Sequence, residues 1–151
     1  MSVAFRRESD EEHLEPRFEI PVPPGPNLVT ARGLEQITAR VAQLEALLPT
    51  VADAEARKPV IRDLRYWRLR LATADLRPPP AGSKAMFGSR VRYRLGGKDN
   101  TITIVGHDEA EPAQLLLSFL APLCRAMLGA EAGDELDFGG REAALEVLEV
   151  S

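Results

Sequence analysis

Ile104-Val-Gly-His-Asp-Glu-Ala110 is followed in this chain by Ala121-Pro-Leu-Cys-Arg-Ala-Met-Leu-Gly129 and then by Ala132-Gly-Asp-Glu-Leu136. The first block predicts a strand that ends in an acidic turn. The second predicts a short helix that begins at a proline and ends at a glycine, and the third predicts a turn into a further strand. Known catalytic motifs do not explain these blocks, so they indicate a fold built for binding.

The residues around these blocks extend the pattern into a small sheet. Strands are predicted at Arg90 to Leu95, Thr101 to Val105, Gln114 to Phe119, Asp134 to Phe138 and Ala143 to Val150. Gly96 to Asn100 turns the chain in the first hairpin, and Gly139-Gly140 turns it in the last. We therefore predict an α+β domain over residues 86–151, in which a small antiparallel sheet packs with one short helix.

Residues 29–76 are predicted to form an antiparallel helical hairpin, a short coiled coil. Two apolar stripes recur every three or four residues, one with Leu34, Ile37, Val41, Leu44 and Leu48, the other with Val60, Leu64, Trp67, Leu71 and Ala74. Thr30 is the expected N-cap, Pro49 ends the first helix, and Pro59 is expected in the first turn of the second. Arms of about 18 residues reach roughly 27 Å. Residues 52–58 either extend the second helix or form the tip.

Two segments lie outside these domains. Residues 1–28 contain Arg6-Arg7, the acidic run Glu8 to Glu12, and dense proline from Pro21 to Pro26, which predicts a disordered or extended tail. The tail is either a solvated leader or a docking segment. Residues 77–85 contain three consecutive prolines and predict a stiff linker.

Composition narrows the class of protein. The chain has 151 residues and a net charge of -4, which disfavours a protein that grips nucleic acid through its phosphates. The lone Cys124 forms no intramolecular disulfide, and no Cys/His cluster has the spacing of a zinc site. The sequence lacks a long apolar run and a signal peptide. We expect a cytoplasmic monomer with no membrane segment, no cofactor, no metal site and no catalytic residues of its own.

Few side chains are candidates for chemistry. His13 and His107 are expected on the surface, and Cys124 is expected to pack in the core rather than react. Arginines 62, 65, 68 and 70 surround Tyr66 and Trp67, which indicates either a solvated helix face or a contact with an acidic partner surface or RNA. Carboxylates near the bend of the hairpin solubilise it unless they are carried to a metal ion; these are Glu45, Asp53 and Glu55.

The order of the motifs resembles the Gre transcript-cleavage factors of bacterial RNA polymerase. That family has Ile-Val-Gly-x-Asp-Glu-Ala, then a Ser-Pro-Ile-Ala-Arg-Ala-Leu-Ile-Gly-like helix, then Val-Gly-Asp-x-Val, and Leu28-Val-Thr-Ala-Arg-Gly33 looks like its first helix start. Ala121 stands where the family has serine. The resemblance implies an FKBP-like carboxy-terminal domain that docks near the polymerase secondary channel. It also implies a hairpin that enters the channel, where tip acids help hold magnesium for cleavage of backtracked RNA.

The resemblance points to a set of docking residues. They are Ala121, Pro122, Leu123, Arg125 and Ala126, with Asp108 and Glu109 of the acidic turn nearby. The alternative is that Leu123, Met127 and Leu128 simply pack the helix onto the sheet.

The chain departs from the family at the hairpin tip. The family carries Gly-Asp-Leu-Lys-Glu-Asn between longer arms, and the nearest string here is Arg62-Asp-Leu-Arg65. A short hairpin on the same domain resembles the branch of the regulator of nucleoside diphosphate kinase. We therefore predict an elongation regulator that binds bacterial RNA polymerase, contacts nascent RNA at most indirectly, and stimulates cleavage weakly or not at all. The alternatives are a full cleavage factor that delivers tip carboxylates to magnesium, an FKBP-like peptidyl-prolyl isomerase, and an interaction module without a polymerase role.

Overall fold

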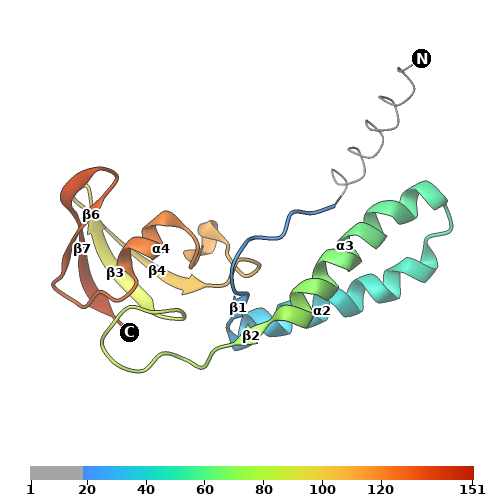
Figure 1. The fold of residues 1–151 in the computed structure, drawn as a ribbon, viewed down its shortest axis with the longest axis horizontal. Coiled ribbons are helices and arrows are strands. Elements are labelled where there is room, and N and C mark those ends of the chain that lie inside the picture. The colour runs from blue at the N-terminus through green and yellow to red at the C-terminus, as the bar shows by residue number, and fades with distance from the viewer. Residues whose placement is uncertain (1–18) are drawn as a thin grey trace, which may run out of the picture. The chain divides into compact units, whose positions relative to one another are not determined.

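The computed structural model describes residues 19–151, and the chain divides into two compact units (Figure 1). The helical unit contains residues 19–25 and Ile37–Thr73, and the carboxy-terminal unit contains Pro26–Gln36 and Ala74–Ser151. The part of the predicted tail with Arg6-Arg7, Glu8 to Glu12 and His13 lies outside the described residues. Among the helices of residues 19–151, none has the apolar length that a membrane span requires. The mixed α+β class is confirmed.

Two helices pack side by side in the helical unit. Helix α2 runs over Ala31–Leu47, the 3-10 turn η1 over Leu48–Thr50, and α3 over Ala54–Thr73. The predicted stripes meet: Val41, Leu44 and Leu64 are buried, and Leu48, Val60, Trp67 and Leu71 pack against them. Because Pro49 lies in η1, α2 ends just before it, as the missing N–H of proline requires.

The start of α3 resolves one open point and corrects another. Ala56 N–H donates to the Asp53 carboxylate at 2.9 Å, so Asp53 caps a helix that begins at Ala54. Residues 54–58 therefore extend the second helix. The expectation that Pro59 lies in the first turn is wrong, because this cap starts the helix five residues before the proline. The 17 residues of α2 and the 20 of α3 correspond to about 26 and 30 Å.

The carboxy-terminal unit is built on a five-stranded sheet in the order β5-β4-β3-β7-β6. Its strands are β3 (Arg90–Leu95), β4 (Lys98–Val105), β5 (Leu116–Ser118), β6 (Glu135–Phe138) and β7 (Arg141–Val150). Helix α4 (Pro122–Met127) covers one face (Figure 1). The core between them consists of Ala85, Val91, Tyr93, Ile102, Ile104, Phe119, Cys124, Met127, Ala130, Leu145 and Val147. On β3, the other face carries Arg90, Arg92 and Arg94.

The sheet is mixed, so the prediction of a purely antiparallel sheet is wrong. Strand β5 pairs with β4 in parallel, with Ile104 opposite Leu117. Between these strands the chain passes through an acidic turn and the 3-10 turn η2 (Pro112–Gln114), which returns it to the same end of the sheet. A parallel neighbour requires such a crossover. Periodicity alone does not report the direction in which a strand enters the sheet.

Both predicted hairpin turns are present and are tighter than expected. Gly96 and Gly97 have φ angles of 60° and 79°, and Gly139 and Gly140 have 63° and 78°. Two consecutive positive φ angles are what a two-residue hairpin turn requires. The strands that follow consequently begin earlier than predicted, at Lys98 and Arg141.

A short parallel ribbon completes the carboxy-terminal unit. Strand β1 (Leu28–Val29) pairs with β2 (Asp75–Leu76), although 45 residues or more of chain lie between them in the sequence. Asp75 N–H donates to the Asn27 carbonyl at 2.8 Å, and Arg77 N–H donates to the Val29 carbonyl at 3.0 Å. The segments that enter and leave the helix pair are thus joined to each other within one unit.

Candidate partner-binding surface

Helix α4 divides its residues between the core and the surface. Cys124 and Met127 are fully buried, whereas Pro122, Arg125 and Leu128 are exposed. Among the other predicted docking residues, Ala121, Leu123 and Ala126 are half-buried. Ala121 occupies the N-cap position and provides no side-chain hydrogen bond, while Pro122 starts the helix without an N–H to satisfy. One side of the helix therefore packs on the sheet and the other is accessible, and docking through the accessible side stays a prediction.

A second segment extends the accessible side of α4. Ala85 N–H donates to the Ala130 carbonyl and Gly129 N–H donates to the Ala85 carbonyl, both at 2.7 Å. Met86, which is 43% exposed, directly follows Ala85, and Leu128, which is 41% exposed, directly precedes Gly129. Lys84 is also exposed. Lys84 and Met86 could not be assigned to this surface from the sequence, because nothing in their local pattern links them to a helix some forty positions later.

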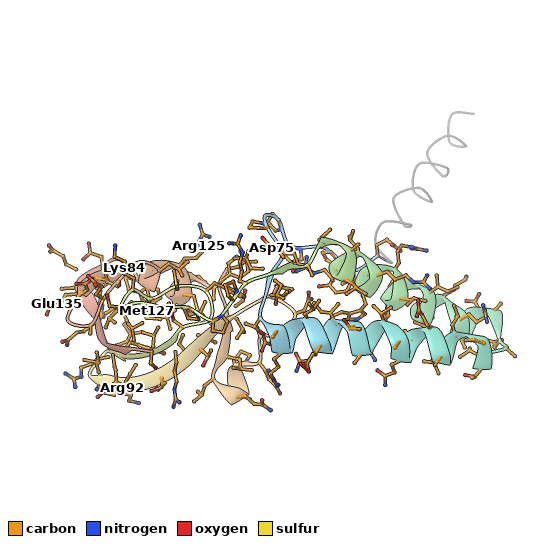
Figure 2. The ribbon with its side chains drawn as sticks, turned by 90° about the horizontal axis from the view of Figure 1, so that it is seen from below. Asp75, Lys84, Arg92, Arg125, Met127 and Glu135 are labelled. Atoms are coloured by element: carbon orange, nitrogen blue, oxygen red, sulfur yellow. The ribbon has the colours of Figure 1, made fainter. Side chains whose placement is uncertain are left out.

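We call the resulting patch the α4 surface; it consists of Lys84, Met86, Pro122, Leu123, Arg125 and Leu128. Figure 2 shows Arg125 and Lys84 on the opposite side of the domain from Arg92, with Met127 in the interior between them. The patch combines cationic ends with exposed apolar side chains. Such a surface suits a partner that presents acidic residues beside apolar ones.

The acidic turn contributes differently from what its composition suggests. His107 is exposed as predicted, and Asp108 is half-buried. The Glu109 side chain, only 5% exposed, accepts a hydrogen bond from Thr30 Oγ1 at 2.5 Å and an ion pair from Arg32 Nη1 at 3.0 Å. A buried carboxylate with two donors is fixed in place. Within the carboxy-terminal unit, Glu109 therefore holds the first turn of α2 against the acidic turn, while its predicted role in docking stays a prediction.

Thr30 and Gly106 take part in the same contacts, and we call the set of Glu109, Thr30, Arg32 and Gly106 the Glu109 anchor. Thr30 Oγ1 also accepts from Gly33 N–H at 3.0 Å, so the predicted N-cap of α2 is confirmed and is shared with Glu109. A Cβ at Gly106 would fall well inside van der Waals contact with the Leu28 carbonyl oxygen. Glycine is needed here because the β1 backbone approaches the end of β4 so closely.

Each of the three predicted tip acids has a separate local role. Glu45 accepts from Arg68 Nη2 at 2.9 Å, Asp53 caps α3, and Glu55 pairs with Lys58 at 2.9 Å. The tip loop is held by Arg57, whose guanidinium donates to the Leu48 and Val51 carbonyls, each at 3.0 Å. Within residues 19–151, no group of three His, Cys, Asp or Glu side chains could hold a metal ion.

The environment of Cys124 confirms its predicted packing role. Its side chain is fully buried in the core, with Sγ 3.9 Å from the Leu117 carbonyl oxygen. Burial raises the pKa of the Cys124 thiol from its ordinary value of 9.0 to about 11, because the thiolate is poorly solvated there. The same cause, with a smaller contribution from Cys124, raises the pKa of Tyr93. A protonated buried thiol is a poor nucleophile.

Comparison with known proteins identifies the carboxy-terminal unit. Residues 80–151 match the family described as transcription elongation factor, GreA/GreB, C-term. Transcription elongation factor GreA of Desulfovibrio desulfuricans is 43% identical over 58 residues, which cover 37% of this chain and 36% of that protein. Transcription elongation factor GreB of Neisseria meningitidis serogroup A is 34% identical over 100 residues, which cover 62% of this chain and 61% of that protein. The chain thus spans less than two thirds of either relative.

A solved structure, the prokaryotic transcription elongation factor GreA/GreB from Nitrosomonas europaea, is also similar. It has 21% sequence identity and a TM-score of 0.40, over 85% of this chain and 99% of that one.

Proposed function

We propose, because the carboxy-terminal domain of this chain belongs to the GreA/GreB family, that the protein is a transcription elongation regulator that binds bacterial RNA polymerase. In this proposal the carboxy-terminal domain, with an FKBP-like arrangement of sheet and helix, docks near the secondary channel through the α4 surface. The helix pair acts as a short hairpin that projects a tip with little or no ability to stimulate transcript cleavage. The observation that carries the docking role is the exposed cationic and apolar side of α4.

The chemistry of the α4 surface supports the docking role. Leu128 and Met86 are each about two-fifths exposed, so a partner that covers them would gain about 1 kcal/mol from each, since complete burial of such a side chain contributes about 1.5 to 3 kcal/mol. Arg125 and Lys84 would steer an acidic partner toward this patch. The buried side of the same helix keeps the patch rigid, because Cys124 and Met127 anchor it in the core. A rigid surface loses little entropy when it binds.

The length of the helix pair and the contacts at its tip support the proposal that cleavage is stimulated weakly or not at all. Arms of 17 and 20 residues reach about 26 to 30 Å. Asp53 is committed to capping α3, and Glu55 pairs with Lys58. A second catalytic cation requires carboxylates that converge on one point. Separate local partners for each acid favour a structural role at the tip.

Binding to core RNA polymerase tests the docking proposal. The full chain is immobilised, and its affinity for purified bacterial core polymerase is measured for Arg125→Ala and for Arg92→Ala. Arg92 provides the matched control because it is an equally simple arginine deletion on the opposite face of the sheet (Figure 2). We expect Arg125→Ala to weaken binding about 5- to 20-fold and Arg92→Ala to change it less than twofold. Equal effects of both variants, or no polymerase binding at all, would refute docking through α4.

Transcript cleavage tests the tip. A stalled, backtracked elongation complex is incubated with the chain, and the length of the RNA 3′ end is followed. We expect shortening close to the rate of the complex alone. Rapid shortening that is lost in Asp53→Asn and Glu55→Gln but kept in Glu45→Gln would instead support the full cleavage factor. Helical circular dichroism of the three variants separates a lost cap from a lost chemical role.

A further inference from the structure

The bend that joins α2 to α3 (Figure 1) is apolar and exposed. Residues 46–52 are Ala-Leu-Leu-Pro-Thr-Val-Ala, and five of these seven residues are exposed, with Leu47 at 43%. We call them the apolar tip. Charged residues make up 28% of the chain, yet the apolar tip contains none. Connections between helices are normally polar, so an uncharged, exposed bend marks a candidate contact surface.

Three carbonyl oxygens of the apolar tip are already hydrogen-bonded within the chain. Thr50 Oγ1 donates to the Leu47 carbonyl at 2.6 Å. Arg57 Nη1 donates to the carbonyls of Leu48 and Val51, each at 3.0 Å. Loop carbonyls usually depend on water, because an unpaired backbone group costs free energy when it is buried. This bend can therefore enter a dry environment while these three carbonyls keep their partners.

The charged residues that flank the apolar tip are each bound within the helical unit. The contacts are an ion pair between the helices, the cap of α3 and an ion pair within α3: Glu45 with Arg68, Asp53 with Ala56 N–H, and Glu55 with Lys58. Arg57, which holds the loop, is half-buried. Three carboxylates and three cations thus offset one another around the bend. The end of the hairpin presents no net charge to a partner.

The composition of the bend selects among kinds of partner. A nucleic acid or an anionic lipid surface attracts clustered cations, and single strands also stack on aromatic side chains. Residues 46–52 contain no cation, and residues 45–58 contain no aromatic residue. Delivery of a metal ion requires converging carboxylates, whereas Asp53 and Glu55 have separate partners. A fixed, uncharged bend with satisfied carbonyls instead suits an apolar cleft in a protein.

We propose that the apolar tip docks in an apolar cleft of the same protein that the α4 surface binds. The inference rests on the proposed function, because it takes that protein to be bacterial RNA polymerase. Leu47 provides the main apolar contact, and Pro49 and Ala52 are exposed in the same bend. The tip thereby fills its cleft and carries no reactive group into it. Two linked contacts bind more tightly than either alone, because the second forms at a high effective concentration.

Two matched leucine variants test the contact through the affinity of the full chain for purified core polymerase. Leu47 and Leu69 are 43% and 44% exposed, and neither belongs to the core that the two helices share. Glutamine has a helix propensity close to that of leucine. We expect Leu47→Gln to weaken binding about 5- to 20-fold, and Leu69→Gln to change it less than about twofold. Equal affinities of the two variants would overturn the proposal.

A pair of added charges sharpens the test. Ala52→Glu places a carboxylate in the apolar tip, and Ala72→Glu places one on an exposed position near the end of α3. Because an unpaired charge is costly in an apolar cleft, Ala52→Glu should weaken binding at least about 30-fold. The Ala72→Glu variant should bind like the unchanged chain. An unchanged affinity of Ala52→Glu would mean that the tip stays in water or meets cations, and either result refutes the proposal.

The same measurements separate this inference from the proposed function. If the unchanged chain does not bind core polymerase, both fail. If it binds, and Arg125→Ala weakens binding while Leu47→Gln and Ala52→Glu do not, only the inference fails. Weaker binding of the tip variants with full binding of Arg125→Ala keeps the tip contact and refutes docking through α4. Sedimentation of the free chain covers a further occupant: a dimer that Leu47→Gln dissociates would assign the tip to a second copy and overturn the inference.

Discussion

The two units of this chain are stabilised in different ways. The carboxy-terminal unit encloses a continuous core of eleven buried residues between a sheet and α4, and its strands pair across long stretches of sequence. Among residues 19–151, the core shared by the two helices has three buried residues, Val41, Leu44 and Leu64. The carboxy-terminal unit can therefore hold a surface in a fixed shape. The helical unit depends on one apolar seam, which makes it the more adjustable part of the molecule.

Core truncation provides the largest test of this difference. Ile104→Ala should lower the free energy of unfolding of the carboxy-terminal unit by about 3 to 4 kcal/mol, because a fully buried side chain in a closed core leaves a cavity. Leu64→Ala should cost the helical unit about 2 to 3 kcal/mol, since its neighbours Val60 and Trp67 are half-exposed and can collapse into the gap. Hydrogen exchange of β-strand amides measures the stability of the carboxy-terminal unit.

The fluorescence of Trp67, the single tryptophan of the chain, follows urea unfolding of the helical unit and so measures its stability. Ile104→Ala should mainly affect strand amides, and Leu64→Ala should mainly affect the tryptophan transition. If each variant shifts both probes equally, the two units unfold as one cooperative body and the comparison fails.

Alkaline pH should weaken the carboxy-terminal unit through Cys124. In the unfolded chain the thiol keeps its ordinary pKa of 9.0, whereas burial raises the pKa in the folded chain to about 11. Between these values the unfolded chain releases a proton that the folded chain retains. Stability is thus fully present below pH 9 and falls as pH rises toward 11, by about 2 to 3 kcal/mol in all.

Urea unfolding at a series of pH values measures this loss. Cys124→Ala is the control, because it removes the titrating group while Tyr93, whose pKa is also raised, remains. The slope between pH 9 and 10.5 should be smaller in the variant. An identical slope in both proteins would mean that the thiol is not the group responsible.

Local features of this fold could be predicted from the sequence. The Thr30 N-cap, the break at Pro49 and the turns at Gly96-Gly97 and Gly139-Gly140 all depend on residues within a few positions of one another. The apolar stripes are likewise local patterns, and they include all seven residues of the seam, although their members Leu34, Ile37 and Ala74 lie outside it and Ala74 lies beyond the end of α3. Helix α4 followed from a proline and a glycine at the expected spacing.

Features that depend on distant partners could not be predicted in the same way. Glu109 reads as part of an exposed acidic turn, and only its partners Thr30 and Arg32, 77 to 79 positions away, account for its burial. The ribbon of β1 and β2 has two residues in each strand, too few for any periodicity. Met86 belongs to the α4 surface through a backbone pairing at Ala85 that no side-chain pattern records.

Removing the charge of Glu109 should have an intermediate effect on the free energy of unfolding. Glu109→Gln keeps the shape of the side chain but replaces the ion pair with Arg32 by a neutral contact, so we expect a loss of about 1 to 2 kcal/mol in the carboxy-terminal unit. Glu111→Gln, an exposed change two residues away, should cost less than about 0.5 kcal/mol. Thermal unfolding gives the stabilities, and hydrogen exchange at Asp75 and Arg77 reports whether the ribbon loosens. Full protection of these amides in Glu109→Gln would show that the β1–β2 ribbon does not depend on the Glu109 anchor.

The smallest effect is expected where the helices are joined by charge. Glu45 and Arg68 are hydrogen-bonded at 2.9 Å, but their side chains are 49% and 58% exposed, so water already solvates both. Glu45→Gln should change the stability of the helical unit by less than about 0.5 kcal/mol. The urea midpoint of Trp67 fluorescence measures it, and the difference should vanish in 0.5 M salt. A loss above about 1.5 kcal/mol would mean that the seam of Val41, Leu44 and Leu64 does not dominate the pairing of α2 with α3, because an apolar seam is insensitive to the loss of one solvated charge.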